Sequence, residues 1–228
     1  MVKRGKLIVI EGTDASGKET QTLEIIKRLR GEGINLASFS FPRYDTPTGD
    51  VVKRYLGKSP YGQEFGPVDD VNPKVASVFY ALDRLATAPL IESELEAGNH
   101  VFCNRYVESN MGHQGGKIKD SGERALFIDW LDKLEYGSFN LPRPDLVLFL
   151  YMPHSVAFQL RGNRGGEADG HEANPQHLLN AERTYIELAE KFKWTRIDCA
   201  PNGKIGSLKS VRQVGDEVYS HVKSLLNN

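Results

Sequence analysis

The residues from Gly12 to Glu19 have the types and spacing suited to one kind of chemistry, the binding of nucleotide phosphates. Gly12, Gly17 and Lys18 satisfy the pattern G-x-x-x-x-G-K-[ST] up to its last position. Glycines let backbone N–H groups turn towards phosphate oxygens, and the lysine adds a mobile positive charge. The sequence therefore predicts a phosphate loop for ATP or GTP over residues 12–19. Its predicted phosphate contacts are Gly12, Asp14, Ala15, Ser16, Gly17, Lys18, Glu19 and Thr20.

Glu19 departs from the pattern, because this position usually carries a serine or threonine whose hydroxyl binds Mg²⁺. Its carboxylate either faces solvent from the first turn of the following helix, where a negative charge is favourable, or contacts Mg²⁺ directly. Thr20 lies about 100° further round that helix and is poorly placed to supply the missing hydroxyl. The sequence leaves both alternatives for Glu19 open.

Strands and helices alternate along the chain in a way that places such a loop at the edge of a parallel sheet. Five apolar runs have strand character, namely KLIVIEG, INLASFSF, HVFCN, DLVLFLY and TRIDC. The first run enters the predicted loop, and a helix with Leu23, Ile26 and Leu29 on one side leaves it. The amides and the dipole at the start of that helix would attract phosphate. The pattern predicts an α/β fold with a parallel sheet covered by helices on both faces.

Two further helices and one loop are predicted from capping residues and periodicity. Asn72 and Pro73 provide an N-cap and a first-turn proline for a helix. Valine and leucine recur at helical spacing over residues 211–225, which predicts a closing amphipathic helix. Residues 161–174 contain four glycines and no apolar side chain larger than alanine, which predicts an exposed loop that acts as a lid. Since no linker divides the chain, we expect a single domain over residues 1–228.

The bulk composition is that of an ordinary globular protein. Lys and Arg number 29 against 30 Asp and Glu, without the basic excess of proteins that bind nucleic acid or anionic membranes. No apolar run approaches the roughly 18 residues of a membrane-spanning helix. Cys103 and Cys199 lie in no metal or redox spacing and are expected to be buried, reduced thiols. We therefore expect a cytoplasmic protein without nucleic-acid or membrane partners.

Several stretches of the chain together resemble the thymidylate kinase family. They are FPRYDTPTG from Phe41, EFGPVDDVNPKVASVFYALDR ending at Arg84, NRYVESNMGHQGG from Asn104, LPRPDLVLFL from Leu141, and the glycine- and arginine-rich segment after Arg161. Their order and approximate spacing match that family over nearly the whole chain. The resemblance implies the fold of the P-loop nucleoside monophosphate kinases, with a five-stranded parallel sheet, flanking helices and a short lid. It also implies transfer of the γ-phosphoryl group of ATP to dTMP, with Mg²⁺ as cofactor, in an enzyme that is commonly a homodimer.

The resemblance assigns roles to residues of an acceptor region between residues 41 and 114. Arg43 and Arg84 correspond to arginines that hold the 5′-phosphate of dTMP. Arg105 also faces this acceptor and joins Lys18 as a catalytic residue. Tyr80, four residues before Arg84, corresponds to the aromatic residue that stacks on thymine, and this spacing puts both on one helical face. The other implied dTMP contacts are Phe41 in the apolar wall, Asn110 at the base edge, His113 beside the sugar, and Asp14 at the 3′-hydroxyl or the magnesium shell.

Transfer between two phosphates also requires positive charge at the transferred group. Two unit charges 4 Å apart repel by ~4 kcal/mol at an effective dielectric of 20, so a site that excludes water needs arginines, whose planar fork binds phosphate in two places. The interior of the predicted phosphate loop contains no arginine, which makes Arg161 and Arg164 of the lid the candidates. The DGHE stretch that follows resembles the Asp-x-x-Glu element of the family. It would place Asp169 and Glu172 near the acceptor or its metal.

Two positions depart from the family pattern and leave alternatives open. Glu19 replaces a hydroxyl, and Asn104 replaces the acid of the family's Asp-Arg-Tyr/His motif. Mg²⁺ would then rely on phosphate oxygens, water, Asp14 and, in one of the two alternatives above, Glu19. A kinase for another deoxynucleoside monophosphate such as dUMP is one alternative, since a contact with one methyl group is worth only ~1–3 kcal/mol. A catalytically weak nucleotide-binding paralogue is the other.

Overall fold

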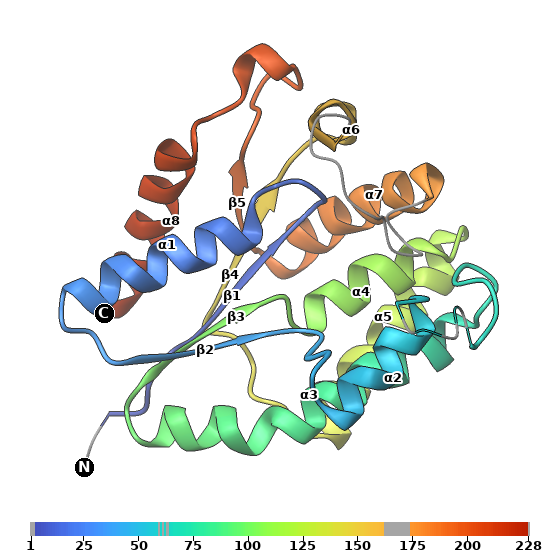
Figure 1. Cartoon of the computed structure of the whole chain (residues 1–228), viewed down its shortest axis with the longest axis horizontal. Helices are drawn as coiled ribbons and strands as arrows, with labels where there is room; N and C mark the ends of the chain where they lie inside the picture. Colours follow the sequence, from blue (N-terminus) through green and yellow to red (C-terminus); the bar gives the residue numbers. More distant parts are fainter. Residues whose placement is uncertain (1–2, 59, 61, 63, 162–173, 228) are drawn as a thin grey trace.

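A parallel sheet runs through the molecule, seen here in a computed structural model that describes residues 3–58, 60, 62, 64–161 and 174–227. Within these residues five strands form the sheet in the order β2-β3-β1-β4-β5 (Figure 1). Their bounds are β1 Leu7–Gly12, β2 Leu36–Ser40, β3 His100–Asn104, β4 Leu146–Tyr151 and β5 Thr195–Asp198. All neighbouring pairs are parallel, and each strand falls within one of the five apolar runs. The predicted five-stranded parallel sheet is confirmed.

Strand β1 occupies the centre of this sheet, and all six of its residues are buried. Ile8 pairs with Phe102 of β3 on one side and with Leu146 of β4 on the other. A strand enclosed on both edges and both faces is expected to be apolar throughout. Glu11 is the exception, with an exposed fraction of 0%. A carboxylate in this position requires buried hydrogen-bond partners, and these belong to the site described below.

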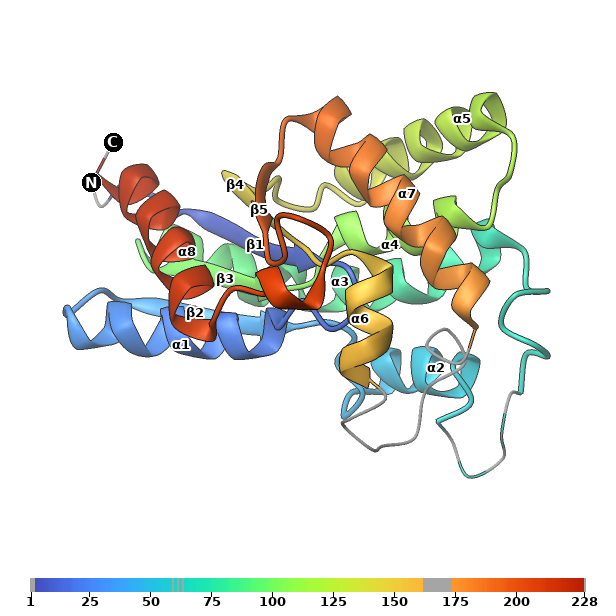
Figure 2. The same ribbon diagram turned by 90° about the horizontal axis from the view of Figure 1, so that it is seen from above.

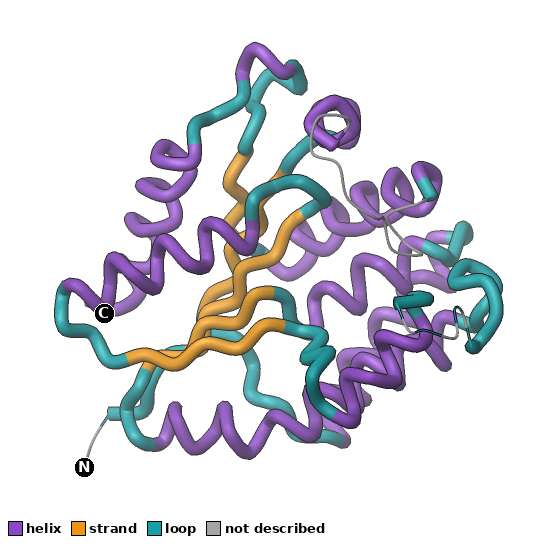
Figure 3. Tube along the Cα trace, in the orientation of Figure 1, coloured by secondary structure: helices purple, strands orange, loops and turns teal. Residues whose placement is uncertain are grey.

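One face of the sheet is covered by α1 (Lys18–Gly31), α8 (Val211–Leu226) and the start of α6 (His154–Arg161), as Figure 3 shows for the helices around the strands. The predicted helix after the phosphate loop and the predicted closing helix are both confirmed. The expectation that Leu23 shares the buried side of its helix was wrong, because this side chain is 62% exposed. Ile25, together with Ile26 and Leu29, packs against the sheet instead.

The opposite face is covered by α3 (Pro73–Glu96), α4 (Val107–Gly116), α5 (Ser121–Asp132) and α7 (Pro175–Phe192). Helices α4 and α7 lie side by side in both Figure 1 and Figure 2. The shorter elements are α2 (Pro47–Tyr55), which packs on α3, the π-helix η1 (Lys133–Ser138) and the 3-10 helix η2 (Ile205–Ser207).

Helix α3 begins as its capping residues predict. The side chain of Asn72 accepts a hydrogen bond from the Lys74 backbone N–H (2.9 Å), and Pro73 is the first helical residue. The thiols of Cys103 and Cys199 are free and buried, which confirms the expectation for both. No helix in the described ranges combines the length and apolar character needed to cross a bilayer.

Candidate functional site

The predicted phosphate loop joins β1 to α1 at the carboxyl end of the central strand (Figure 1). Gly17 has a φ of 80°, a left-handed conformation that favours glycine, and α1 begins at the next residue. A Cβ atom on Gly12 would lie 2.5 Å from the carbonyl oxygen of Leu150, so a larger residue does not fit there. The loop therefore has its glycines where the backbone requires them, and it ends at a helix N-terminus that attracts phosphate.

The Lys18 ammonium group is held by the backbone of this loop. Its Nζ donates hydrogen bonds to the carbonyl oxygens of Gly12 (2.9 Å) and Thr13 (2.8 Å), and the side chain is buried. Burial and, to a smaller extent, repulsion from Arg105 lower the pKa of Lys18 to about 7. A phosphate group would oppose both effects, so Lys18 is placed to gain charge when a nucleotide binds.

The side chains after Lys18 differ in their exposure. Glu19 and Thr20 are exposed on the first turn of α1, and both alternatives for Glu19 stay open. Ser16 is buried, and its Oγ has no hydrogen-bond partner among the described residues. This hydroxyl is therefore an unused donor inside the loop, available to a phosphate oxygen.

A pocket opens beside the phosphate loop. It lies outside the carboxyl ends of the strands, where open α/β sheets bind their ligands. Its lining residues are Asp14, Phe41, Pro42, Tyr44, Leu56, Tyr80, Arg84, Arg105, Tyr106, Ser109, Asn110, His113, Gln114 and Leu178. The fold therefore brings together the predicted residues Asp14, Phe41, Tyr80, Arg84, Arg105, Asn110 and His113, from segments far apart in the sequence.

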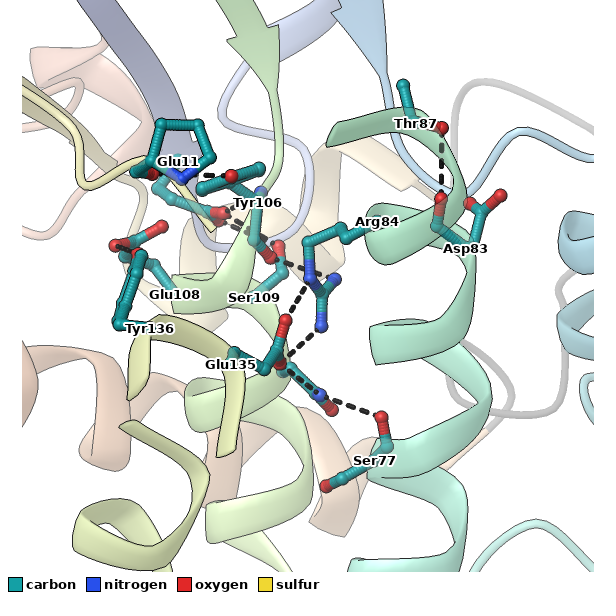
Figure 4. Close-up of polar contacts among 12 residues, drawn as sticks. Glu11, Ser77, Asp83, Arg84, Thr87, Tyr106, Glu108, Ser109, Glu135 and Tyr136 are labelled. Atoms are coloured by element: carbon teal, nitrogen blue, oxygen red, sulfur yellow. Dashed lines mark hydrogen bonds and ion pairs between the residues drawn. The ribbon is translucent and has the colours of Figure 1, made fainter. Parts of the chain in front are cut away.

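Arg84 enters this pocket wall already paired with a carboxylate (Figure 4). Its Nε and Nη2 donate to the two carboxylate oxygens of Glu135 at 2.5 and 2.6 Å, and its Nη1 donates to the carbonyl oxygen of Tyr106 at 3.2 Å. Arg84 is 2% exposed and Glu135 0%, so the pair is shielded from water. Because Glu135 offsets its charge, the role of Arg84 at the acceptor phosphate stays a prediction, and the pair fixes the shape of the wall.

Arg105 presents its charge to the pocket in a different way. It follows β3 directly, with a φ of 65° that is uncommon for a residue with a side chain. Its Nη1 donates to Ser109 Oγ at 3.2 Å and lies 3.4 Å from His113 Nε2. Arg105 forms no ion pair with any described residue, in contrast to Arg84. Its guanidinium is therefore available to an anionic group in the pocket.

Glu11 ties together the elements that carry Arg105. Its carboxylate accepts hydrogen bonds from the Tyr106 backbone N–H (2.9 Å), from Ser109 Oγ (2.8 Å) and from the Tyr185 hydroxyl (3.2 Å). These three partners lie at the end of β3, on α4 and on α7. The buried carboxylate is thereby satisfied, and it fixes α4 and α7 against the central strand.

The remaining predicted residues lie outside this wall or outside the described residues. Arg43 is half-buried next to the lining residues Pro42 and Tyr44, and its Nη1 donates to Thr87 Oγ1 at 3.3 Å. Arg161 is the last residue of α6. The prediction that Arg164, Asp169 and Glu172 act from a lid falls on residues 162–173, which lie outside the described residues.

Sequence reasoning missed several residues that hold the site together. Glu11 carried a local signal, since it is a charged residue at the end of the most apolar predicted strand. Glu135, His177 and Tyr185 carried none, because each reaches the site only through the tertiary packing of η1 and α7. These three positions become visible only in the structure.

Comparisons with known proteins consistently point to one family. The sequence model of the family described as thymidylate kinase matches residues 10–206. The human thymidylate kinase is 32% identical over 220 residues, covering 95% of this chain and 89% of the relative. A probable thymidylate kinase from Pyrococcus abyssi is 28% identical, with 96% and 97% covered. The solved thymidylate kinase from Candida albicans shares the fold, with a TM-score of 0.73 at 21% identity over 98% of this chain and 93% of that one. The chain therefore belongs to the thymidylate kinase family, the enzymes that transfer the γ-phosphoryl group of ATP to dTMP.

Proposed function

We propose that this chain phosphorylates dTMP in the pocket beside its phosphate loop, giving dTDP and ADP. The observation that carries the proposal is the shared wall, in which Asp14 of the phosphate loop and the guanidinium of Arg105 line one pocket. Lys18 would hold the outer phosphates of ATP, and Arg105 would hold the acceptor phosphate that receives the γ-phosphoryl group. Catalysis of phosphoryl transfer depends mainly on positioning the reacting groups and stabilising their charge, so we assign these two cations to catalysis.

The proposed base-binding end of the pocket has a donor–acceptor pattern suited to a thymine ring. The amide Nδ2 of Asn110 donates to the Ser77 carbonyl oxygen and to Glu135 Oε1, both at 3.1 Å. These two acceptors fix the orientation of the amide, and Asn110 Oδ1 is left buried without a partner among the described residues. This oxygen could accept a hydrogen bond from N3–H of thymine. The Tyr80 ring and the buried Phe41 would supply apolar contact around the base.

The proposed lid residues would add positive charge to that of Lys18 and Arg105. Arg161 and Arg164 would neutralise the transferred phosphoryl group, while Asp169 and Glu172 would lie near the acceptor or its metal. Arg43 would support the acceptor phosphate from beside the pocket.

We expect Arg164→Ala to reduce kcat by about 10³-fold, the scale of an arginine that stabilises this transition state, with a smaller change in KM for dTMP. Normal turnover would remove Arg164 from the mechanism.

We propose Mg²⁺ as the metal cofactor, held mainly by the nucleotide. The described residues contain no cluster of three His, Cys, Asp or Glu side chains able to hold a metal ion. Mg²⁺ does not require such a cluster, because at nucleotide sites it keeps several waters and is held by one or two carboxylates together with phosphate oxygens. Asp14 at the pocket wall and Glu19 on the first turn of α1 are the carboxylates that we propose for this role. The ion would supply neutralisation of phosphate charge.

A homodimer in the cytoplasm is the assembly and location that we propose. Four apolar side chains on α3 are exposed by 41% to 51%, namely Val75, Val78, Leu82 and Leu90. Their spacing places them along one side of the helix, where a second copy could cover them. Free, buried Cys103 and Cys199 suit a reducing compartment. Sedimentation of the wild type and of Leu82→Glu tests the dimer, which the variant should weaken.

An ADP-release assay with ATP, Mg²⁺ and a panel of nucleoside monophosphates tests the function. We expect the highest kcat/KM with dTMP. Activity chiefly with dUMP would instead favour a different acceptor, because uracil offers the same N3–H and lacks only the methyl group. Binding of ATP and dTMP without turnover would contradict the proposed enzyme and favour a nucleotide-binding paralogue.

A further inference from the structure

Two histidines from different helices meet at the wall of the proposed acceptor pocket, which His113 lines. His113 of α4 and His177 of α7 have parallel rings with centroids 5.5 Å apart, and His113 Nδ1 lies 3.2 Å from His177 Nε2. At one end, His113 Nε2 lies 3.4 Å from Arg105 Nη1. At the other end, His177 Nδ1 lies 3.4 Å from Asp69 Oδ1. A chain of four polar side chains therefore runs from the pocket guanidinium to a carboxylate in the segment before α3.

Arg105 and Asp69, at the two ends of this series of side chains, determine the protonation of the two histidines between them. A guanidinium can only donate hydrogen bonds, and an ionised carboxylate can only accept them. His113 Nε2 must therefore accept from Arg105, which leaves the proton of His113 on Nδ1, donated to His177 Nε2. His177 in turn carries its proton on Nδ1, towards Asp69. Both rings are neutral in this arrangement, and a proton added to either ring places two donors face to face.

The fold brings the two helices unusually close at this point. A Cβ atom on Gly112 would lie 2.6 Å from the Tyr185 ring, and one on Gly116 would lie 3.0 Å from the Ala181 backbone nitrogen. These two glycines of α4 lie on either side of His113 in the sequence, so their missing side chains let α7 approach. His177 is 2% exposed as a result, which shields its contact with His113 from competing water.

The outer end of the chain is held in place by the N-cap of α7. Asn174 Nδ2 donates to Asp69 Oδ2 at 2.5 Å, while Asn174 Oδ1 accepts from the backbone N–H groups of Gln176 and His177. One asparagine thus caps the helix and fixes the carboxylate that faces its third residue. Asp69 is 40% exposed, so this end of the chain is open to solvent and to protons.

Charged and titratable groups from several elements surround the two rings. Arg105 and the Tyr185 ring contact His113, and Asp14, His154 and Glu182 line the small cavity that His113 also lines. Lys117, which directly follows α4, interacts electrostatically with Asp69 and Asp70, and its Nζ donates to Tyr55 Oη and to the Val68 carbonyl oxygen. Among the described residues, Arg105 supplies a positive charge in direct contact with His113, and this charge opposes a second proton on that ring.

We propose that His177 is a positioning residue for the acceptor, acting through His113 on Arg105. His177 holds His113 in the neutral tautomer that accepts from the guanidinium, and Asp69 holds His177 in its matching tautomer. At a pH above the pKa of the histidines, these hydrogen bonds keep the Arg105 guanidinium aimed into the pocket. A proton gained by either ring releases the guanidinium. This inference rests on the proposed role of Arg105 in binding the acceptor phosphate.

Steady-state kinetics of three variants over about pH 5.5 to 8.5 test the proposal, since unperturbed histidine titrates near pH 6.5. In the wild type, KM for dTMP should rise as the pH falls through the histidine range, and this rise should be smaller in His177→Leu. KM for ATP is not the reference, because Lys18, whose pKa is lowered to about 7, titrates over the same pH range. His177→Leu can neither donate nor accept, so KM for dTMP should be raised about three- to tenfold at high pH, as expected for one lost hydrogen bond. His177→Gln can accept from His113 and donate to Asp69, so it should restore the low KM at high pH. His221→Leu, on the exposed face of α8, is the matched control.

The outcomes separate this inference from the proposed function. Wild type without dTMP kinase activity would contradict the function itself. An active wild type whose KM for dTMP and pH profile are unchanged in His177→Leu would overturn the inference alone, and so would equal losses in His177→Leu and His177→Gln. Should His177→Leu fail to fold, long-range ¹H–¹⁵N spectra of the wild-type rings decide, because the proposal requires Nδ1–H tautomers at both His113 and His177. Nε2–H at either ring would overturn it.

Discussion

The phosphate loop and the acceptor pocket lie side by side but are built in different ways. The loop is one short run of residues whose shape comes from backbone conformation, glycines and a helix N-terminus. The pocket wall is assembled from side chains of the loops after β1, β2 and β3 and of helices α3, α4 and α7. It is held by the ion pair of Arg84 and Glu135 and by the carboxylate of Glu11. The comparison indicates that the loop should tolerate side-chain changes away from its glycines and lysine, whereas the pocket should depend on single buried carboxylates.

The largest expected effect is the removal of the carboxylate that supports the pocket. Glu135→Ala leaves the guanidinium of Arg84 buried and unpaired, which should lower the free energy of unfolding by about 3–5 kcal/mol. Replacing both partners by leucine should recover much of this loss, because apolar pairs often substitute for buried ion pairs. Denaturant unfolding measures both effects.

A matched control for this variant is an exposed pair of similar geometry. Asp132 binds Arg143 through two hydrogen bonds at 2.8 and 2.9 Å, but the arginine side chain is 59% exposed. Asp132→Ala should therefore cost less than about 1 kcal/mol. Equal costs for Glu135→Ala and Asp132→Ala would contradict the view that burial makes the acceptor wall depend on its ion pair.

Removal of the loop's cation should affect turnover and leave the fold intact. Lys18→Ala takes away the charge assigned to the outer phosphates, so kcat should fall by about 10²–10³-fold, the scale for one lost electrostatic contact to the transition state. The free energy of unfolding should change little, because the variant also removes the cost of burying an ammonium group whose pKa is lowered to about 7. Lys27→Ala, on the exposed side of α1, is the control for both measurements. A kcat equal to that of the control would exclude Lys18 from the reaction.

A second carboxyl behind the pocket should make stability depend on pH. Burial, with a smaller contribution from Glu11, raises the pKa of Glu108 from 4.5 to about 7, although the Tyr136 hydroxyl donates to it at 2.7 Å (Figure 4). The folded state therefore binds this proton more tightly than the unfolded state does. Its stabilising contribution is complete below about pH 4.5 and is lost as the pH rises to about 7, for a total of about 3 kcal/mol.

Glu108→Gln tests this pH dependence, because glutamine keeps an acceptor for the Tyr136 hydroxyl and has no proton to lose. Unfolding free energies at about pH 5 and about pH 8 should differ less in the variant than in the wild type. Glu96→Gln, on an exposed position of α3, should keep the wild-type difference. If Glu108→Gln also keeps it, another group is responsible for the pH dependence.

The same contrast explains what could be predicted from sequence. The five strands, the helix caps at Asn72 and Pro73, and the phosphate loop were predicted because each depends on neighbouring residues. The family resemblance then identified seven of the fourteen residues that line the pocket. It could not show that Arg84 is already paired with Glu135, since that contact spans 51 residues of chain.

The error at Leu23 has a related cause. The buried side of α1 includes the polar residues Gln21 and Thr22, whose side chains hydrogen-bond to the Val211 and Lys18 carbonyl oxygens. Because successive residues are about 100° apart around a helix, a buried side centred near Thr22 turns Leu23 towards solvent. Apolar periodicity alone cannot locate a buried side that contains satisfied polar groups.

The smallest expected effect concerns Glu19, the residue that departs from the phosphate-loop pattern. Its side chain is exposed and belongs to the part of the molecule that should tolerate change, so Glu19→Ser should leave ATP binding and the free energy of unfolding intact. A serine hydroxyl at this position is the usual protein ligand of Mg²⁺, so the variant should reach half-maximal turnover at a lower Mg²⁺ concentration. Glu24→Ser, also exposed on α1, should keep the wild-type Mg²⁺ profile. If both variants keep it, then Mg²⁺ does not depend on position 19, and the metal is held by the nucleotide, by water and by Asp14.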